Sequence, residues 1–207
     1  MCIRDSFTAA HGPQDEKLLA GVALPAEPFV LYPASLWRHK NHVRLLEALA
    51  LVRDRSLALV LTGASFGRLG ELQAVASRLG LEGRLHHLGF VSDEALPALY
   101  RRARAVVFPS LYEGFGLPPL EAMACGCPVA SSLAASLAEV CGDAVEVLLP
   151  AEPEQMARAI ERVASDAELR ESLRKRGFTQ AARFSWAEAA DRHLAAYRRA
   201  AATIGTV

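Results

Sequence analysis

Short apolar runs and longer amphipathic stretches follow one another along most of this chain. Short runs typical of buried strands occur at residues 29–32, 57–61, 84–88, 105–108, 129–130 and 145–149. Apolar residues recur at helical spacing between and after these runs, which predicts helices over residues 43–52, 69–79, 93–102, 118–125, 133–141, 153–163, 167–176 and 185–200. Ser92 and Ser185 stand where the N-caps of two of these helices are expected.

The alternation of strands with helices predicts an α/β fold. Strands that are apolar on both faces are typical of a parallel sheet, so the expected architecture is a Rossmann-like parallel sheet with helices on both faces. In such sheets, ligands bind beyond the carboxyl ends of the strands. Four loops are expected to meet at that edge, at residues 38–40, 63–64, 89–91 and 113–121.

Three segments of the chain differ in pattern. Residues 1–28 are mixed polar and rich in alanine, proline and glycine, which is typical of a linker or of the remnant of another domain. Residues 29–184 contain the alternating elements and form the expected ligand-binding domain. Residues 185–207 carry a last amphipathic helix, whose apolar residues include Trp186, Leu194 and Tyr197.

Charge and cysteine content disfavour several classes of partner. Lys and Arg together number 23, as do Asp and Glu, so no overall field attracts nucleic acid or an anionic bilayer, and phosphate binding requires a local cluster. The four cysteines lack histidine partners at zinc-ligand spacing, which favours reduced thiols in a cytoplasmic protein.

No apolar run approaches the ~18 residues of a membrane-spanning helix, and residues 1–6 do not resemble a secretory signal. Peripheral membrane contact through another domain stays open.

The segment 106–131, VVFPSLYEGFGLPPLEAMACGCPVAS, combines a strand end, a glycine-bearing turn and a helix start. Gly114 and Gly116 let bare backbone approach a ligand, and the two prolines at 118–119 suit the first turn of a helix. Backbone N–H groups in such a turn and at a helix N-terminus favour an anion. Glu113 precedes the glycine turn and Glu121 is expected in the first turn of the helix after it, so the two carboxylates lie on either side of the glycine turn. Carboxylates in these positions can accept hydrogen bonds from paired hydroxyls. A nucleotide sugar, which carries both phosphates and diols, would use all of these groups.

Each of these features also has an ordinary structural interpretation. Glu121 could simply complement the helix dipole, and a glycine pair could be only a loop. The basic loop that contains Arg38 and Lys40 could be a solvated turn, although both side chains suit a diphosphate. His86 and His87 are adjacent in an expected strand and therefore face opposite sides, which disfavours a shared metal site.

The run EGFGLPPLEAMACGCPV resembles the E-x7-E signature of retaining glycosyltransferase family 4, whose members have the GT-B fold. The resemblance extends over residues 29–197: YPASLWRHKNH is similar to the family's phosphate-loop segment, and HHLGFVSDEALPALYRRARAVVFPS resembles the stretch before the signature. GT-B enzymes pair two Rossmann-like domains, and this chain resembles the C-terminal, donor-binding one. The implied partner is an acceptor-binding N-terminal domain, or a second copy of the chain in a homodimer.

The resemblance assigns roles to individual residues. In family members the lysine that matches Lys40 contacts the donor diphosphate, and the glutamate that matches Glu121 holds the ribose hydroxyls. The glutamate that matches Glu113 lies near the donor sugar and is the expected catalytic residue. Many members have an arginine where this chain has Ser35, and Arg38 is the expected substitute. The other expected donor-binding positions are Gly63, Phe90, Val91, Gly114, Phe115, Gly116 and Leu117.

The resemblance therefore predicts a retaining hexosyltransferase. It would move a mannosyl- or glucosyl-type sugar from a UDP- or GDP-sugar to an unknown glycan or lipid-linked acceptor. No D-x-D motif is present, so neither a metal nor a further cofactor is expected. Two alternatives stay open: an epimerase of the same fold that acts on nucleotide sugars, and a nucleotide-sugar-binding module without catalytic activity. An NAD-dependent enzyme is disfavoured because no G-x-G-x-x-G follows the first strand.

Overall fold

A parallel six-stranded sheet forms the centre of the structure, a computed structural model that describes residues 7–9 and 13–204. Its strands are β1 (Phe29–Pro33), β2 (Ala58–Thr62), β3 (Leu85–His87), β4 (Ala105–Phe108), β5 (Val129–Ser131) and β6 (Glu146–Val147). They lie in the order β3-β2-β1-β4-β5-β6. The predicted Rossmann-like sheet is confirmed, and each predicted strand is present within about two residues of its expected bounds.

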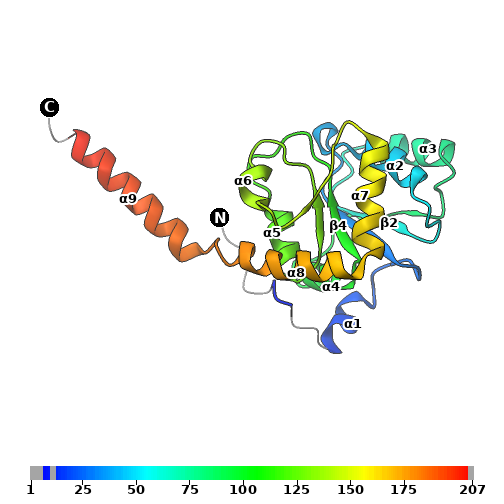
Figure 1. Cartoon of the computed structure of the whole chain (residues 1–207), viewed down its shortest axis with the longest axis horizontal. Coiled ribbons are helices and arrows are strands. Elements are labelled where there is room, and N and C mark those ends of the chain that lie inside the picture. The colour runs from blue at the N-terminus through cyan, green and yellow to red at the C-terminus, as the bar shows by residue number, and fades with distance from the viewer. Residues whose placement is uncertain (1–6, 10–12, 205–207) are drawn as a thin grey trace.

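Helices cover both faces of this sheet (Figure 1). They are α1 (Pro13–Leu19), α2 (His42–Leu51), α3 (Leu69–Arg78), α4 (Ala95–Arg102), α5 (Leu117–Ala124), α6 (Leu137–Cys141), α7 (Pro153–Ser165), α8 (Ala167–Ala181) and α9 (Trp186–Ile204), with a 3-10 turn, η1, at Arg38–Lys40. On one face α2 packs against α3 and α7, while α5 on the other face packs against α4, α6 and α8. Right-handed crossovers require this division, because the chain leaves β1 in one direction along the sheet and β4 in the other.

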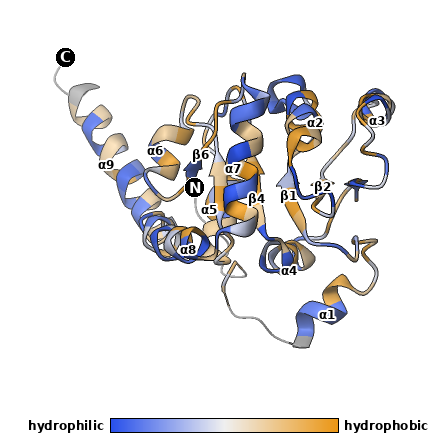
Figure 2. Ribbon diagram, turned by 45° about the vertical axis from the view of Figure 1, so that its right-hand side comes forward, coloured by the Kyte–Doolittle hydropathy of each residue, from blue (hydrophilic) through white to orange (hydrophobic). Residues whose placement is uncertain are grey.

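The core lies between the sheet and the inner sides of the helices. In the central strands Val30, Leu31, Val106 and Val107 have no exposed surface. Figure 2 shows central strands, such as β4, that are largely apolar, and helices, such as α7, that combine apolar and polar sides. Burial of each large apolar side chain stabilises the fold by about 1.5–3 kcal/mol, so the sheet is the most strongly constrained part of the domain.

Three helices differ by four or five residues from the predicted ones, and one of them, α9, ends at Ile204 instead of at residue 200. The helix expected at residues 133–141 begins only at Leu137, because Ala135 has a φ of 52°, which a right-handed helix excludes. α8 continues beyond the predicted end at residue 176 and passes through Gly177. A Cβ at Gly177 would lie 3.1 Å from Met123 of α5, so the glycine serves the close packing of two helices instead of ending one.

The expected linker at residues 1–28 contains a helix. α1 packs against α4, where Asp15 accepts hydrogen bonds from Arg101 at 2.8 and 2.6 Å. The rings of Phe7 and Tyr100 also meet, with centroids 5.9 Å apart. The local pattern did not predict these contacts because the partners are more than eighty positions apart. Residues 1–6, 10–12 and 205–207 lie outside the described residues, and with them lie Cys2 and the stretch compared with a secretory signal.

The last helix, α9, extends away from the rest of the domain (Figure 1). Its predicted cap is confirmed, since Ser185 Oγ accepts a hydrogen bond from the amide of Glu188 at 3.1 Å. Trp186 and Tyr197 are 58% and 67% exposed, so this helix presents aromatic side chains that the sheet does not cover. Within the described ranges, no helix has the length and apolarity needed to cross a membrane.

His42, the first residue of α2, is a buried ionisable group near the carboxyl end of β1. Its side chain lies against Tyr32, with ring centroids 4.8 Å apart, and the residue is 3% exposed. Burial is the main cause that lowers the pKa of His42 from 6.5 to about 4. The carbonyl of Ala34 opposes this shift, whereas the positive charges of Arg68 and Lys40 add to it. The imidazole is therefore neutral in the folded protein at pH 7.

Because of His42, the folded chain should lose stability as the pH falls from about 7.5 to about 4.5. In the unfolded chain this histidine takes up a proton near pH 6.5, but in the folded chain only near pH 4, so acid favours the unfolded state. The loss due to His42 is about 2–3 kcal/mol at pH 4.5. Urea unfolding of His42→Gln should show a decline that is smaller by this amount. His193→Gln, on exposed α9, should decline like the unmodified chain, and equal declines in all three proteins would contradict the assignment.

Candidate functional site

The carboxyl ends of β1 and β4 lie side by side in the middle of the sheet. The chain leaves β1 toward β2 and leaves β4 toward β5, so this is the topological switch point, where Rossmann-like sheets bind ligands. Two loops begin here. Residues 34–41 lead from β1 into α2, and residues 109–116 lead from β4 into α5. These loops contain the basic cluster and the glycine turn that stand out in the sequence.

An ion pair joins the two loops. Lys40 Nζ lies 2.5 Å from Glu113 Oε1, although 73 positions separate these residues in the chain. The two side chains are only 16% and 11% exposed. The ammonium group also lies over the ring of Phe108, 5.5 Å from its centroid, where a cation is attracted by the ring electrons. The structure thus brings together the lysine and the glutamate that the resemblance places at a diphosphate and at a donor sugar.

The side chains of Tyr32 and Asn41 hold these loops in position. The hydroxyl of Tyr32 donates to the carbonyl of Lys40 at 2.8 Å and lies 3.0 Å from Ser110 Oγ. Burial raises the pKa of Tyr32 well above 10, so the hydroxyl keeps its proton and remains a donor. Asn41 has a left-handed backbone with a φ of 63°, and its side chain donates to the carbonyl of Pro150 at 2.7 Å. These supports were not predicted, because each joins segments distant in the sequence.

Contacts from two other segments hold the glycine turn at residues 114–116. Ser136 Oγ lies 2.9 Å from the carbonyl oxygens of both Glu113 and Phe115. The ring of Phe115 packs edge-on against Phe184, with centroids 5.9 Å apart. The side chain of Phe115 is therefore used in packing, and backbone groups remain as its contribution to a ligand.

The two glycines of this turn have different reasons for being glycine. Gly116 has a φ of 105°, which disfavours other residues, and a Cβ there would lie 2.6 Å from Leu137. Neither constraint applies to Gly114. Its φ lies outside the left-handed range, and an added Cβ would have no atom within 4 Å. The fold alone thus explains Gly116 but not Gly114.

Glu121 lies farther along α5 than the sequence predicted. The helix begins at Leu117, so Glu121 is its fifth residue, and the predicted place in the first turn is wrong. Tyr100 of α4 donates a hydrogen bond to Glu121 Oε2 at 2.9 Å. Burial, followed by the negative charge of Glu121, raises the pKa of Tyr100, so the tyrosine remains a donor. This bond orients the carboxylate from a neighbouring helix.

The loops after β2 and β3 form the rest of this edge. Gly63 donates its amide to the carbonyl of Gly89 at 2.7 Å, and a Cβ on Gly63 would lie 2.7 Å from the backbone nitrogen of Ser35. Ser35 Oγ accepts a hydrogen bond from the loop after β2 at 3.2 Å. Ser35, where the resemblance led us to expect an arginine, therefore ties two loops together. Phe90 is 85% exposed, whereas Val91 packs against the core.

Two arginines add positive charge at this edge. Arg38 is exposed, and its guanidinium group makes no hydrogen bond or ion pair with any residue that the structure describes. Arg68 donates to the carbonyl of Leu36 in the loop after β1 at 2.9 Å and pairs with Glu71 at 3.1 Å. Arg68 was not predicted as a site residue. Its signal in the sequence was its place in the loop that follows the strand predicted at residues 57–61.

Metal ligands and reactive thiols do not gather near this edge. The described part of the chain contains no group of three His, Cys, Asp or Glu side chains that could hold a metal ion. Cys125, Cys127 and Cys141 are buried and free. Burial raises the pKa of Cys125 to about 12 and that of Cys141 to about 11, so these thiols are protonated.

Comparison with known proteins identifies the family. The family profile described as "Glycosyl transferases group 1" matches residues 16–180. The chain belongs to this family. O-antigen chain mannosyltransferase B of Escherichia coli is 39% identical to it over 173 residues, which make up 82% of this chain and 45% of that protein.

Solved structures share the fold of this family member. Sucrose-phosphate synthase from Thermosynechococcus elongatus matches it with a TM-score of 0.82 and 27% identity, over 98% of this chain and 52% of that one. HepE of Anabaena, solved in complex with UDP and glucose, matches with a TM-score of 0.81 and 25% identity, over 96% and 55% of the two chains. The chain therefore spans about half the length of these relatives. Its fold corresponds to one Rossmann-like half of a GT-B glycosyltransferase.

The ion pair between Lys40 and Glu113 should be measurable in the free energy of unfolding. Lys40→Met and Glu113→Gln each leave a largely buried charge without its partner, so a double-mutant cycle should give a coupling energy of about 1–3 kcal/mol. Arg44 and Glu47, 2.7 Å apart with side chains 53% and 32% exposed, form the control pair. Their coupling should not exceed about 0.5 kcal/mol. Equal coupling in the two cycles would show that other contacts hold the loops together.

Proposed function

We propose that this chain is the donor domain of a retaining hexosyltransferase and binds a nucleoside-diphosphate sugar at the carboxyl edge of its sheet. The ion pair between Lys40 and Glu113 carries the proposal, because it sets a cation and a carboxylate beside the glycine turn that leads into α5. Membership of the family supports sugar transfer. The name of the E. coli relative supports a mannosyl donor, and the complex of HepE with UDP and glucose supports a uridine nucleotide.

Lys40 is the proposed ligand of the donor diphosphate. Its ammonium group is neutralised by Glu113 in the structure, and phosphate oxygens would take over this role when donor binds. Glu113 would then lie next to the sugar that the diphosphate carries. Arg38, in the same loop as Lys40, would supply a second cation. Backbone N–H groups at the start of α5 add partial positive charge, so this proposal needs no metal ion.

Glu121 is the proposed acceptor of hydrogen bonds from the ribose hydroxyls. The hydrogen bond from Tyr100 fixes the direction of its carboxylate, which lowers the ordering cost on binding. Gly63 and Val91 would border the base from the loops after β2 and β3. The exposed ring of Phe90 offers an aromatic face against which a base can stack.

Glu113 is the proposed catalytic residue. It would hold the donor sugar in a reactive position, while Lys40 and the N–H groups of α5 stabilise the charge that develops on the leaving diphosphate. The acceptor, an unknown glycan or lipid-linked molecule, would be held opposite this edge by a second domain or a second copy of the chain. We place the reaction in the cytoplasm, which the free, buried cysteines among the described residues support. Formation of a glycosylated acceptor, instead of an isomerised nucleotide sugar, distinguishes transfer from epimerisation.

Nucleotide binding tests the donor site directly. Titration calorimetry in EDTA should show that the chain binds UDP or GDP, and the tighter of the two identifies the base. Gly114→Ala should leave the melting temperature unchanged, because the added Cβ has no atom within 4 Å. It should weaken binding by about tenfold or more, because the methyl group would lie between the backbone and a phosphate. Gly83→Ala, an equally open position near the start of β3, is the control and should bind normally. No heat with either nucleotide would refute the donor site.

Substitution of Glu121 tests the ribose contact. Glu121→Ala should weaken nucleotide binding by about 1.5–3 kcal/mol, the range for hydrogen bonds to a charged group. The melting temperature should also fall, because the buried hydroxyl of Tyr100 loses its acceptor, so the affinity is the deciding measurement. Glu139→Ala, an exposed site on α6, should leave the affinity unchanged. A normal affinity in Glu121→Ala, together with a lower melting temperature, would limit Glu121 to a structural role.

A further inference from the structure

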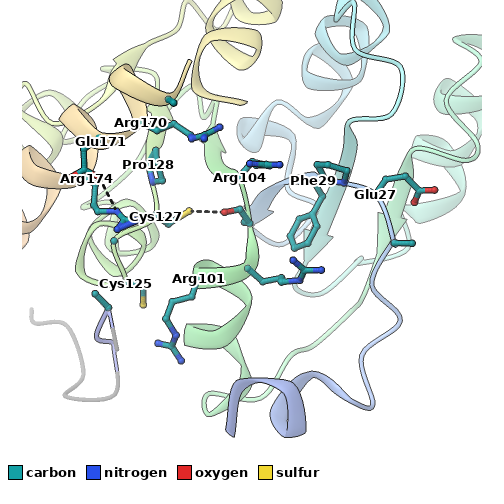
Figure 3. A pocket seen from close by; sticks show the side chains of 17 residues that line it. Glu27, Phe29, Arg101, Arg104, Cys125, Cys127, Pro128, Arg170, Glu171 and Arg174 are labelled. Atoms are coloured by element: carbon teal, nitrogen blue, oxygen red, sulfur yellow. Dashed lines mark hydrogen bonds and ion pairs between the residues drawn. The ribbon is translucent and has the colours of Figure 1, made fainter. Parts of the chain in front are cut away.

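A cavity lies at the opposite edge of the sheet, where the strands begin. It has a volume of about 510 Å³ and is lined by the segments before β1 and β4, the turn between α5 and β5, and the first half of α8. Figure 3 shows Arg104 and Phe29 on one side of it, and Arg170 and Arg174 of α8 on the other. The proposed donor site lies at the carboxyl ends of the same strands, so the length of the sheet separates the two sites.

Arginine is the main charged residue in this lining. Five arginines and two glutamates contribute, an excess of three positive charges in a chain whose charged residues balance at 23 each. These residues are Arg101, Arg102, Arg104, Arg170, Arg174, Glu27 and Glu171. Like charges around one cavity repel each other, so the arrangement favours a bound anion.

Two of the arginines are used by the fold itself. Arg101 pairs with Asp15 at 2.6 Å, and its side chain is 6% exposed. Arg170 donates through Nη1 to the carbonyl of Ala164 at 2.7 Å. These bonds fix α1 and α8 at the sides of the cavity and explain two of the five charges without a ligand.

The other three arginines lack a strong partner. Arg102 and Arg104 are exposed, and among the described residues their guanidinium groups have no hydrogen bond or ion pair. Arg174 lies 3.8 Å from Glu171, which also pairs with Lys175 at 3.7 Å. An exposed pair of this kind contributes little. The protein therefore leaves most of this charge open to a ligand.

The cysteines in the lining add no negative charge. Burial raises the pKa of Cys125 to about 12 and raises that of Cys127 as well, so both are protonated thiols. They are also too weakly ionised to act as nucleophiles. A neutral, poorly solvated wall strengthens the attraction between the arginines and an anion.

We propose that this cavity, the arginine pocket, binds an anion that carries one or more phosphate groups. The planar fork of arginine matches the oxygens of a phosphate, and Arg102, Arg104 and Arg174 approach from two segments of the chain. A multiply charged group balances the excess of positive charge, which a single carboxylate does not. The same chemistry is found in soluble phosphorylated molecules and in the headgroups of anionic lipids. The proposal does not depend on the donor site.

Inorganic pyrophosphate is a suitable probe of the pocket. Added to the ¹⁵N-labelled chain in about 0.15 M salt, it should shift the amide resonances of residues 101–104, 125–128 and 170–174 in a saturable way. The double variant Arg104→Gln/Arg174→Gln should weaken this binding by about tenfold or more. Arg158→Gln/Arg198→Gln removes the same charge from exposed positions on α7 and α9, and should change the affinity by less than about twofold.

Separate results test the proposal and identify the source of the phosphate. Absence of saturable shifts at these residues, or equal affinity in the two double variants, would overturn it. Lys40→Met should affect only shifts at the carboxyl edge, so failure of the donor site and failure of the arginine pocket are distinguishable. Co-sedimentation separates the two sources of phosphate. Arginine-dependent binding to phosphatidylglycerol vesicles, but not to phosphatidylcholine vesicles, would assign a lipid headgroup, whereas pyrophosphate binding without vesicle binding would assign a soluble molecule.

Discussion

The parallel pairing of β1 with β4 is the constraint on which the candidate site depends. Val30 pairs with Ala105 and Leu31 with Val106, and all four residues are fully buried. A shift in this register would disturb close packing on both faces of the sheet. Because the register is fixed, the two loops that follow these strands start from fixed points, and Lys40 can reach Glu113. The candidate site is thus a consequence of core packing, although Lys40 and Glu113 themselves contribute little apolar burial.

Much of the fold and part of the site were predictable because their signals are local. The strand at residues 105–108, the turn and the helix after it are marked by a β-branched run, two glycines and two prolines, each of which acts through its own backbone preference. The same holds for the cap at Ser185. The meeting of the lysine loop with the glutamate loop was also predictable, since parallel strands place all of their following loops at one edge.

The rest depended on side chains that meet across long stretches of chain. The pattern around Glu121 resembles a helix start, and only the hydrogen bond from Tyr100 shows that another helix orients its carboxylate. Alanine favours helices, but Ala135 has a left-handed backbone that excludes it from α6. The next residue, Ser136, forms hydrogen bonds to the glycine turn. Residues 1–28 were interpreted as a linker because their packing depends on the ion pair between Asp15 and Arg101. That pair forms only when the folded chain brings the two residues together.

The electrostatics of the helices explains the positions of only some of the arginines that line the cavity. Arg101 and Arg102 lie in the last turn of α4, where positive side chains are stabilised by the helix dipole. Arg104 lies beyond that helix, and Arg174 lies in the middle of α8, where the dipole offers no such stabilisation. Both nevertheless line the cavity that Arg101 and Arg102 line. Helix electrostatics therefore accounts for one part of this cluster. The part that it leaves unexplained consists of exposed, weakly paired guanidinium groups around a neutral wall, and an anion in the cavity accounts for these.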